Sequence, residues 1–182
     1  PSIETEGLIT NCFLERNDPR EILISKNNQD FQKLKKDSIV GTSSFRREFQ
    51  LKRIRHDLKY KLIRGNVDTR IKKLNENLFD AIILSYAGIK SLNLTNNISQ
   101  IFSISEIIPS AGQGVIALQC INEYKKQELD KIVLAINDQK TFYEILAERS
   151  LVRNLNGSCQ SPISSNATTF NKEELTLKGG VA

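Results

Sequence analysis

The stretch Ser38-Ile39-Val40-Gly41-Thr42-Ser43-Ser44 decides the fold, because it joins a strand, a glycine turn and a helix cap within seven residues. Its β-branched residues favour a strand, and its glycine permits the turn that follows. The hydroxyl of Ser43 or Ser44 can accept hydrogen bonds from the first free amides of a helix. We therefore predict a helix over residues 45–56, entered directly from the end of a strand.

The predicted helix carries two apolar stripes. Phe45 and Phe49 form one stripe, and Leu51, Ile54 and Leu58 form the other. Residues spaced in this way share a helix face. We expect the helix to be buried on two sides.

The same helix carries the strongest basic cluster of the chain. Residues 46–55 include five basic residues and one acid: Arg46, Arg47, Lys52, Arg53, Arg55 and Glu48. A helix N-terminus attracts anions, and basic residues in its first turn strengthen that attraction. The cluster predicts a polyanionic partner such as a phosphate, a nucleic acid or a polycarboxylate. A solvated helix face is the alternative interpretation.

Two more strand-helix units follow. We predict strands over 60–65 and 79–85 and helices over 66–77 and 87–92. This alternation is typical of an α/β fold with a mixed, largely parallel sheet. Ligands of such sheets bind outside the carboxyl ends of the strands. Residues 41–44, 64–70 and 84–88 fall at those ends and should meet there.

The rest of the chain predicts two smaller units. A strand over 6–14 precedes the turn at residues 17–19, and a Pro/Gly-rich connector at 107–114 leads to a strand over 115–121, which we expect to return to the first one. Helices over 125–136 and 141–155, a loop with a cysteine and strands over 163–170 and 175–178 follow. The last part should form an incomplete α+β unit.

Composition limits the class of protein. Of the 182 residues, 39% are hydrophobic and 26% are charged, and the formal net charge is +5. No apolar run has the length of a membrane span. Three cysteines without metal-ligand spacing favour neither a disulfide framework nor a metal site and indicate a reducing compartment. The single histidine, His56, lies in the basic helix and offers little support for histidine catalysis. The chain begins at Pro1 and lacks methionine, so we expect it to be part of a longer protein.

Four motifs together resemble one family, the porphobilinogen deaminases (hydroxymethylbilane synthases). They occur in the family's order and close to its spacing, and they cover essentially the whole chain: Val40-Gly-Thr-Ser-Ser-Phe-Arg-Arg47, Leu62-Ile-Arg-Gly-Asn-Val-Asp-Thr-Arg70, Pro109-Ser-Ala-Gly-Gln-Gly114 and Gly157-Ser-Cys-Gln-Ser-Pro-Ile163.

The resemblance implies a monomeric cytoplasmic transferase of haem and tetrapyrrole biosynthesis. Such an enzyme joins four porphobilinogen molecules head to tail with release of ammonia, on a dipyrromethane cofactor held by a thioether. It has three domains, two of which resemble type II periplasmic binding proteins. On this basis residues 1–16 and 109–137 belong to domain 1, residues 17–108 form domain 2, and residues 138–182 form part of domain 3.

The resemblance also assigns binding residues. Cys159 would hold the cofactor covalently. The acetate and propionate groups of cofactor and growing chain would be bound or surrounded by residues from the motifs: Thr42, Ser43, Ser44, Arg46, Arg47, Arg64, Arg70, Leu84, Ser85, Gly88 and Gln113. Arginine suits this task because it keeps its charge and pairs bidentately with carboxylates.

Two departures from the family are visible. Ser91, beside Lys90, stands where the family has an arginine. The family's catalytic aspartate belongs to a Lys-Asp-Val-Pro stretch whose last residue corresponds to Pro1, so we expect no catalytic carboxylate in this chain and no turnover by it alone.

Two non-enzymatic alternatives remain at this stage. A nucleic-acid-binding module would use the basic cluster, but aromatic residues are only 7% of the chain and no nucleic-acid motif is present. A non-catalytic anion-binding α/β module would share the sheet edge. Neither alternative needs a cysteine on a Gly/Pro loop. The family resemblance implies porphobilinogen as the partner, and we expect no nucleic acid, membrane or metal.

Overall fold

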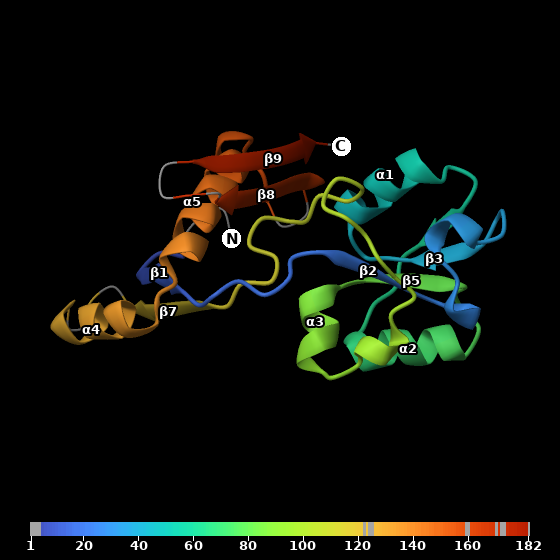
Figure 1. The fold of residues 1–182 in the computed structure, drawn as a ribbon, viewed down its shortest axis with the longest axis horizontal. Coiled ribbons are helices and arrows are strands. Elements are labelled where there is room, and N and C mark those ends of the chain that lie inside the picture. Colours follow the sequence, from blue (N-terminus) through green and yellow to red (C-terminus); the bar gives the residue numbers. More distant parts are fainter. Residues whose placement is uncertain are drawn as a thin grey trace.

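The computed structural model describes residues 5–121, 123, 126–158, 161–169, 171 and 174–181 (Figure 1). Its strands form three separate sheets, ordered β1-β7, β4-β3-β5-β2-β6 and β8-β9. The strands are β1 (Leu8–Phe13), β2 (Glu21–Ser25), β3 (Ile39–Gly41), β4 (Lys59–Lys61), β5 (Ala81–Ser85), β6 (Gln100–Ile101), β7 (Ala117–Ile121), β8 (Ile163–Thr169) and β9 (Leu175–Val181). The α-helices are α1 (Phe45–Ile54), α2 (Val67–Asn75), α3 (Tyr86–Ser91), α4 (Lys126–Ile136) and α5 (Gln139–Asn154), and short 3-10 turns cover Lys26–Asn28, Phe31–Lys33 and Thr95–Asn97.

The five-stranded sheet is mixed, as predicted. Strand β3 pairs in parallel with β4 and β5, whereas β2 pairs antiparallel with β5 and β6. Four of its strands therefore run in one direction and β2 runs against them. The register Glu21↔Ser85 brings the first residue of β2 to the carboxyl end of β5. An acid that precedes an apolar run is thereby placed at the sheet edge where ligands are expected.

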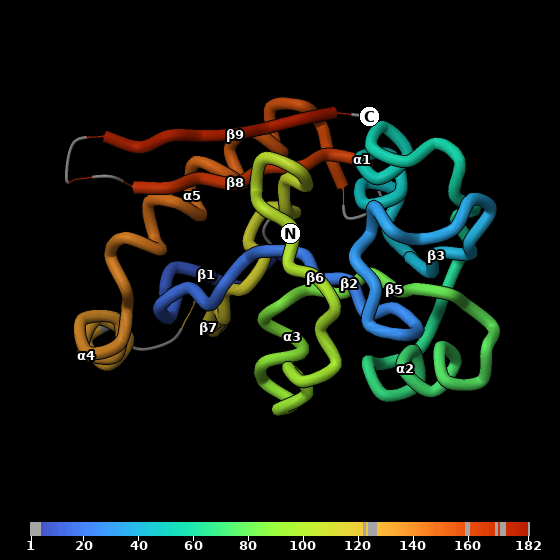
Figure 2. Tube along the Cα trace, turned by 45° about the vertical axis from the view of Figure 1, so that its right-hand side comes forward, coloured from blue at the N-terminus to red at the C-terminus, as the bar shows by residue number. Residues whose placement is uncertain are grey.

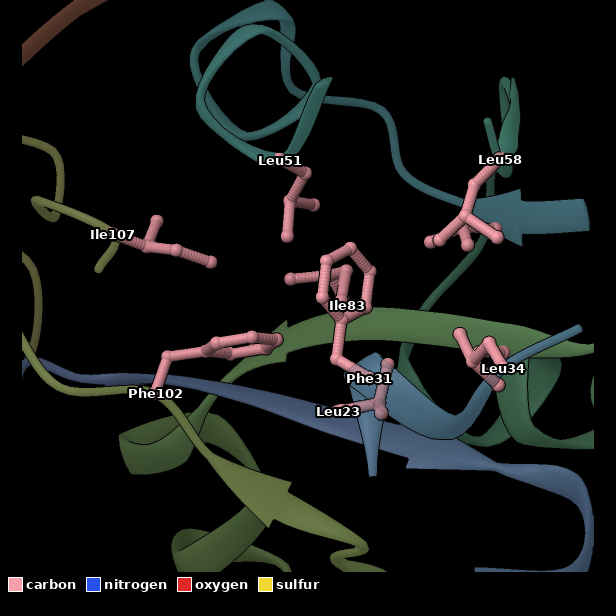
Figure 3. Packing of buried hydrophobic residues seen from close by; sticks show 10 residues of the cluster. Leu23, Phe31, Leu34, Leu51, Leu58, Ile83, Phe102 and Ile107 are labelled. Carbon is pink, nitrogen blue, oxygen red and sulfur yellow. The ribbon is translucent and has the colours of Figure 1, made fainter. Parts of the chain in front are cut away.

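Both faces of this sheet are covered. Along β5, Ala81 and Ile83 pack into one core cluster, and Ile82 and Leu84 pack into the other. Figure 3 shows the first cluster, where Leu51 of α1 faces the sheet and Phe31 meets Phe102 edge to face with ring centroids 5.5 Å apart. Helices α2 and α3 cover the second cluster. The continuous apolar run of β5 is explained by this double burial.

One expectation about α1 is wrong. Leu51, Ile54 and Leu58 pack against the first core cluster as predicted. Phe45 and Phe49 do not, because 69% and 41% of their surfaces are exposed. Helical spacing identifies an apolar stripe but does not say whether a second layer lies over it. In this chain the other side of α1 has no such layer over Phe45 and Phe49.

Two chain segments connect the five-stranded sheet to the rest of the molecule and run side by side (Figure 1). The amide of Leu14 donates to the Ile116 carbonyl at 3.0 Å, and that of Asn17 donates to the Gly114 carbonyl at 2.8 Å. Gly114 has φ +82°, and a Cβ there would lie 2.5 Å from the Asn17 carbonyl oxygen. Only glycine allows the two connectors to approach so closely.

Helix α5 and the β8-β9 hairpin lie over the smaller sheet β1-β7, and α4 lies at its edge (Figure 2). In both views the hairpin is on the same side of the molecule as α1, and α2 and α3 are on the opposite side. Helix α5 is the longest helix among the described residues, with 16 residues. No helix in the described ranges is both long and apolar enough to cross a membrane.

A buried carboxylate connects these parts. Glu148 of α5 is fully buried and accepts hydrogen bonds from the Arg16 guanidinium at 2.6 and 3.2 Å. It also accepts from the amides of Gly112 and Ala167, each at 2.7 Å. Arg16 follows β1, Gly112 lies in the second connector and Ala167 lies in β8. One side chain therefore joins four segments that are far apart in sequence.

We predict that Glu148→Gln lowers the free energy of unfolding by about 3 kcal/mol, because it leaves the buried Arg16 guanidinium without its main counter-charge. Denaturant titration followed by circular dichroism would measure the change. Glu76→Gln is the control, since Glu76 forms an exposed ion pair with Lys72 at 3.7 Å and its loss should change stability by less than about 0.5 kcal/mol. Equal effects of the two substitutions would contradict the prediction.

Candidate functional site

A cleft of about 1010 Å³ lies between the carboxyl edge of the five-stranded sheet and the part of the molecule that contains α5. One wall comes from the turn between β3 and α1, the start of α1 and the end of β4. The other comes from β1, the second connector, α5 and the residues that follow α5. Seven of the predicted binding residues line it: Thr42, Ser43, Ser44, Arg46, Arg47, Arg64 and Gln113.

The hydroxyl residues form the cap of α1. The Ser44 side chain accepts from the amide of Arg47 at 3.3 Å, so Ser44 is the N-cap. Thr42 is 3% exposed, and its hydroxyl accepts from the amide of Ser44 at 3.2 Å. Ser43 is exposed at the cleft. Thr42 and Ser44 therefore shape the turn, while Ser43 remains accessible to a ligand.

Arg46 and Arg47 share one buried carboxylate. Glu21 is fully buried, and its two oxygens lie 2.5 Å from Nη2 of Arg46 and 2.8 Å from Nη2 of Arg47. Arg46 also donates to the Ile108 carbonyl at 2.7 Å. One carboxylate against two guanidiniums leaves one net positive charge at this end of the cleft. Arg46 is thus occupied mainly by protein groups, whereas Nε of Arg47 is buried without a hydrogen-bond partner in the described structure.

The pKa of Glu21 reflects these contacts. Burial acts to raise it, but the positive charges of Arg47 and Arg46 outweigh burial and hold the pKa of Glu21 below its ordinary value. Burial lowers the pKa of Arg46, and Glu21 opposes that change. Because an arginine pKa starts far above neutrality, the guanidinium remains charged. The group is therefore an ion triad at neutral pH.

Other arginines extend the positive edge. Arg64, after β4, is exposed at the cleft, and no ion pair is recorded for its guanidinium within the described ranges. Arg70 of α2 donates to the Gly65 carbonyl at 2.7 Å and does not belong to the cleft lining. Burial lowers the pKa of Arg70, and the positive charge of Arg47 lowers it further. Arg149 of α5 lines the opposite wall.

The remaining predicted residues have mainly packing roles here. Gln113 donates from Nε2 to the Pro19 carbonyl at 2.6 Å, which joins the two connectors beside the cleft. Leu84 belongs to the second core cluster. Ser85 ends β5 and Gly88 lies in α3, and neither lines the cleft. Binding roles for Leu84, Ser85 and Gly88 stay predictions.

Residues on both sides of the predicted cofactor cysteine lie at the cleft. Cys159 lies outside the described residues, but Ser158 and Ser161 line the cleft. Gly157 is buried, and a Cβ there would lie 2.4 Å from Cδ1 of Ile163 and 2.9 Å from Cγ1 of Val152. The absence of a side chain at Gly157 therefore lets the end of α5 pack directly on the start of β8.

Sequence reasoning did not identify Glu21 or Arg149 as part of the site. Glu21 could have been noticed as a lone acid beside the apolar run of β2. An acid buried with such a strand is rarely left unpaired, so it predicts a basic partner. Its arginine partners lie 25 and 26 positions later, so local periodicity could not identify them. Among the described residues, no group of three or more histidine, cysteine or acidic side chains could hold a metal ion.

Two family models match the chain. Residues 1–130 match "Porphobilinogen deaminase, dipyromethane cofactor binding domain", and residues 142–182 match "Porphobilinogen deaminase, C-terminal domain". The chain belongs to the porphobilinogen deaminase family. This agrees with the four sequence motifs, each of which contributes residues to the lining of one cleft: 42–47, 62 and 64, 110–113, and 158, 161 and 163.

Curated porphobilinogen deaminases support the same assignment. The protein from Sulfurimonas denitrificans is 40% identical over 98% of this chain and 56% of its own length. Those from Lysinibacillus sphaericus and Campylobacter hominis are 41% and 43% identical over 100% and 92% of this chain. These matches cover 58% and 54% of the two relatives, so the chain spans little more than half of the length of the porphobilinogen deaminases that it matches.

Solved structures similar to the chain include periplasmic binding proteins. An arginine-specific one from Salmonella typhimurium is 13% identical with a TM-score of 0.43, over 81% of this chain and 64% of its own. An arginine transport protein from Legionella pneumophila is 10% identical with a TM-score of 0.40, over 79% of this chain and 66% of its own.

The Glu21 ion triad predicts an acid-dependent loss of stability. The folded pKa of Glu21 lies below its ordinary value of 4.5, so ionised Glu21 stabilises the fold above pH 4.5 and this contribution is lost as pH falls through the folded pKa. The free energy of unfolding should therefore decrease as the pH is lowered below 4.5. In Glu21→Gln it should be about 3 kcal/mol lower at pH 7 and should drop less on acidification.

Urea titrations at several pH values between 7 and 3 would measure this difference. Glu48→Gln is the control, because Glu48 forms a partly exposed pair with Lys52 at 2.6 Å. That variant should follow the parent curve to within about 0.5 kcal/mol. A constant difference between Glu21→Gln and the parent at all pH values would show that the carboxylate charge is not the cause.

Proposed function

We propose that this chain is the part of a hydroxymethylbilane synthase that binds the polycarboxylated pyrroles. In that reaction four porphobilinogen molecules are joined head to tail with release of ammonia. We further propose that residues 17–108 act as the central carboxylate-binding domain, that 1–16 and 109–137 belong to domain 1 and that 138–182 belong to the cysteine-bearing domain 3. We also propose that the protein is a cytoplasmic monomer; the free thiols of Cys12 and Cys120 agree with the reducing compartment.

The observation that carries the proposal is the cleft itself. Arginines from both walls and hydroxyl groups from the α1 cap surround a space large enough for an oligopyrrole chain. Each pyrrole of such a chain brings two carboxylates, and arginine pairs with them without losing its charge. Arg47 is half-buried at the cleft, and its unpartnered Nε is a donor that a ligand carboxylate could satisfy.

The residues present fit a dipyrromethane cofactor. Arg47, Arg64 and Ser43 are the accessible donors for its carboxylates, and Cys159 is the candidate thioether position. When bound, this group supplies the primer on which pyrroles are joined. The protein's own contribution is to hold the anionic side chains and to keep the growing product attached. A non-catalytic anion-binding module would also explain the arginines. It would not explain why residues 142–182 match the C-terminal domain of the family.

Arg64 provides the most direct test of carboxylate binding. We predict that Arg64→Gln weakens porphobilinogen binding about tenfold, because a charge-assisted hydrogen bond contributes about 1.5–3 kcal/mol. Isothermal titration calorimetry at low ionic strength would measure the dissociation constant. Arg64 is exposed, so the variant should keep the melting temperature of the parent.

Arg53→Gln is the matched control, because Arg53 is an exposed arginine of α1 outside the cleft lining. It should leave the dissociation constant unchanged within about twofold. No saturable binding to the parent chain, or equal losses in both variants, would contradict the proposed site.

Cys159 is tested by intact mass. In the full-length protein purified from cells that make porphobilinogen, we predict extra mass equal to one dipyrromethane, because a thioether survives purification. Cys159→Ser should remove this mass. Cys12→Ser and Cys120→Ser should retain it, since both residues lie in the β1-β7 sheet, Cys12 being buried. A full-length protein without added mass, or added mass that persists in Cys159→Ser, would refute this assignment.

A further inference from the structure

Two large apolar side chains are exposed at the mouth of the cleft. Phe45, the first residue of α1, is 69% exposed, and Leu62, which follows β4, is 61% exposed. Both line the cleft. They take no part in either core cluster of the five-stranded sheet. Their apolar surface is therefore not explained by packing within the described chain.

The backbone places these two residues on the same wall. Strand β3 pairs in parallel with β4 through Gly41↔Lys61, and the amide of Thr42 donates to the Lys61 carbonyl at 3.1 Å. Leu62 follows Lys61 directly, and Phe45 follows the Thr42 turn by three residues. This arrangement depends on main-chain pairing of two strands, so it does not rely on flexible side chains.

Cationic groups surround this apolar pair. Phe45 is followed by Arg46 and Arg47, and Leu62 is separated from Arg64 by one residue, all of them in the cleft lining. An uncharged lipid or an apolar peptide would offer these guanidiniums no anionic partner. A small aromatic ring that carries carboxylates matches both features, because its face can pack on Phe45 and its acids can reach the arginines.

We propose that Phe45 and Leu62 form an apolar shelf that packs against the ring face of a carboxylated pyrrole. This inference rests on the proposed function and extends it, since it explains how the cleft distinguishes a pyrrole from an acyclic dicarboxylate. The arginines bind the carboxylates of the ligand, and the shelf contacts the flat face of its ring. Phe45 is then a specificity-determining residue.

The test compares porphobilinogen with adipate, a dicarboxylate without a ring, by isothermal titration calorimetry on the same chain. Phe45→Ala should weaken porphobilinogen binding about tenfold, and Leu62→Ala about threefold. Neither should change adipate binding by more than about twofold, because both leave the arginines in place. Arg64→Gln should weaken both ligands.

Phe49→Ala is the matched control. Phe49 lies one turn along α1, is 41% exposed and does not line the cleft, so porphobilinogen binding should stay at the parent value. Equal losses in Phe45→Ala and Phe49→Ala, or equal losses of both ligands in Phe45→Ala, would overturn the shelf. If Arg64→Gln still weakens porphobilinogen while Phe45→Ala has no effect, the shelf fails and the proposed function stands. Absence of porphobilinogen binding to the parent chain would overturn both.

Discussion

The carboxylate of Glu21 is the interaction on which the cleft depends. It begins β2 at the carboxyl edge of the sheet and contacts both arginines of the first turn of α1. Arg46 then reaches the Ile108 carbonyl in the second connector. Removing three charges from water is costly, and only mutual pairing offsets that cost. One acid that is distant in sequence therefore holds the first turn of α1 at the carboxyl edge of the sheet, together with the packing of Leu51 in the core.

Much of the five-stranded sheet could be predicted from local pattern. The run at residues 79–85 predicted a strand, and β5 forms there and packs into both core clusters. The cap at Ser44 followed from residue chemistry. Strand β6 was not predicted, because two residues carry no periodicity and its pairing with β2 depends on tertiary context. Phe45 and Phe49 were assigned to a buried stripe because periodicity cannot reveal that no layer covers them.

The sequence predicted the location of the candidate site better than the contacts made by each of its residues. Motif spacing and the rule for strand ends pointed to one edge of the sheet, and residues 42–47 and 64 line a cleft at that edge. The direction of each side chain depended on partners elsewhere in the chain. Arg46 turns toward Glu21, Gln113 toward Pro19, and Leu84 into the core. Such long-range contacts leave no local pattern, and Cys159 lies outside the part of the chain that the structure describes.

The paired connectors have a consequence for how the two walls meet. A single flexible link would let one wall rotate about several axes relative to the other. Here two links are hydrogen-bonded to each other through Asn17 and Gly114 and braced by Gln113, which resists twisting and leaves bending as the easiest relative motion. Fewer degrees of freedom mean a smaller entropy loss when a ligand draws the walls together. The close approach at Gly114 thus limits the relative motion of the two walls at a point outside the cleft lining.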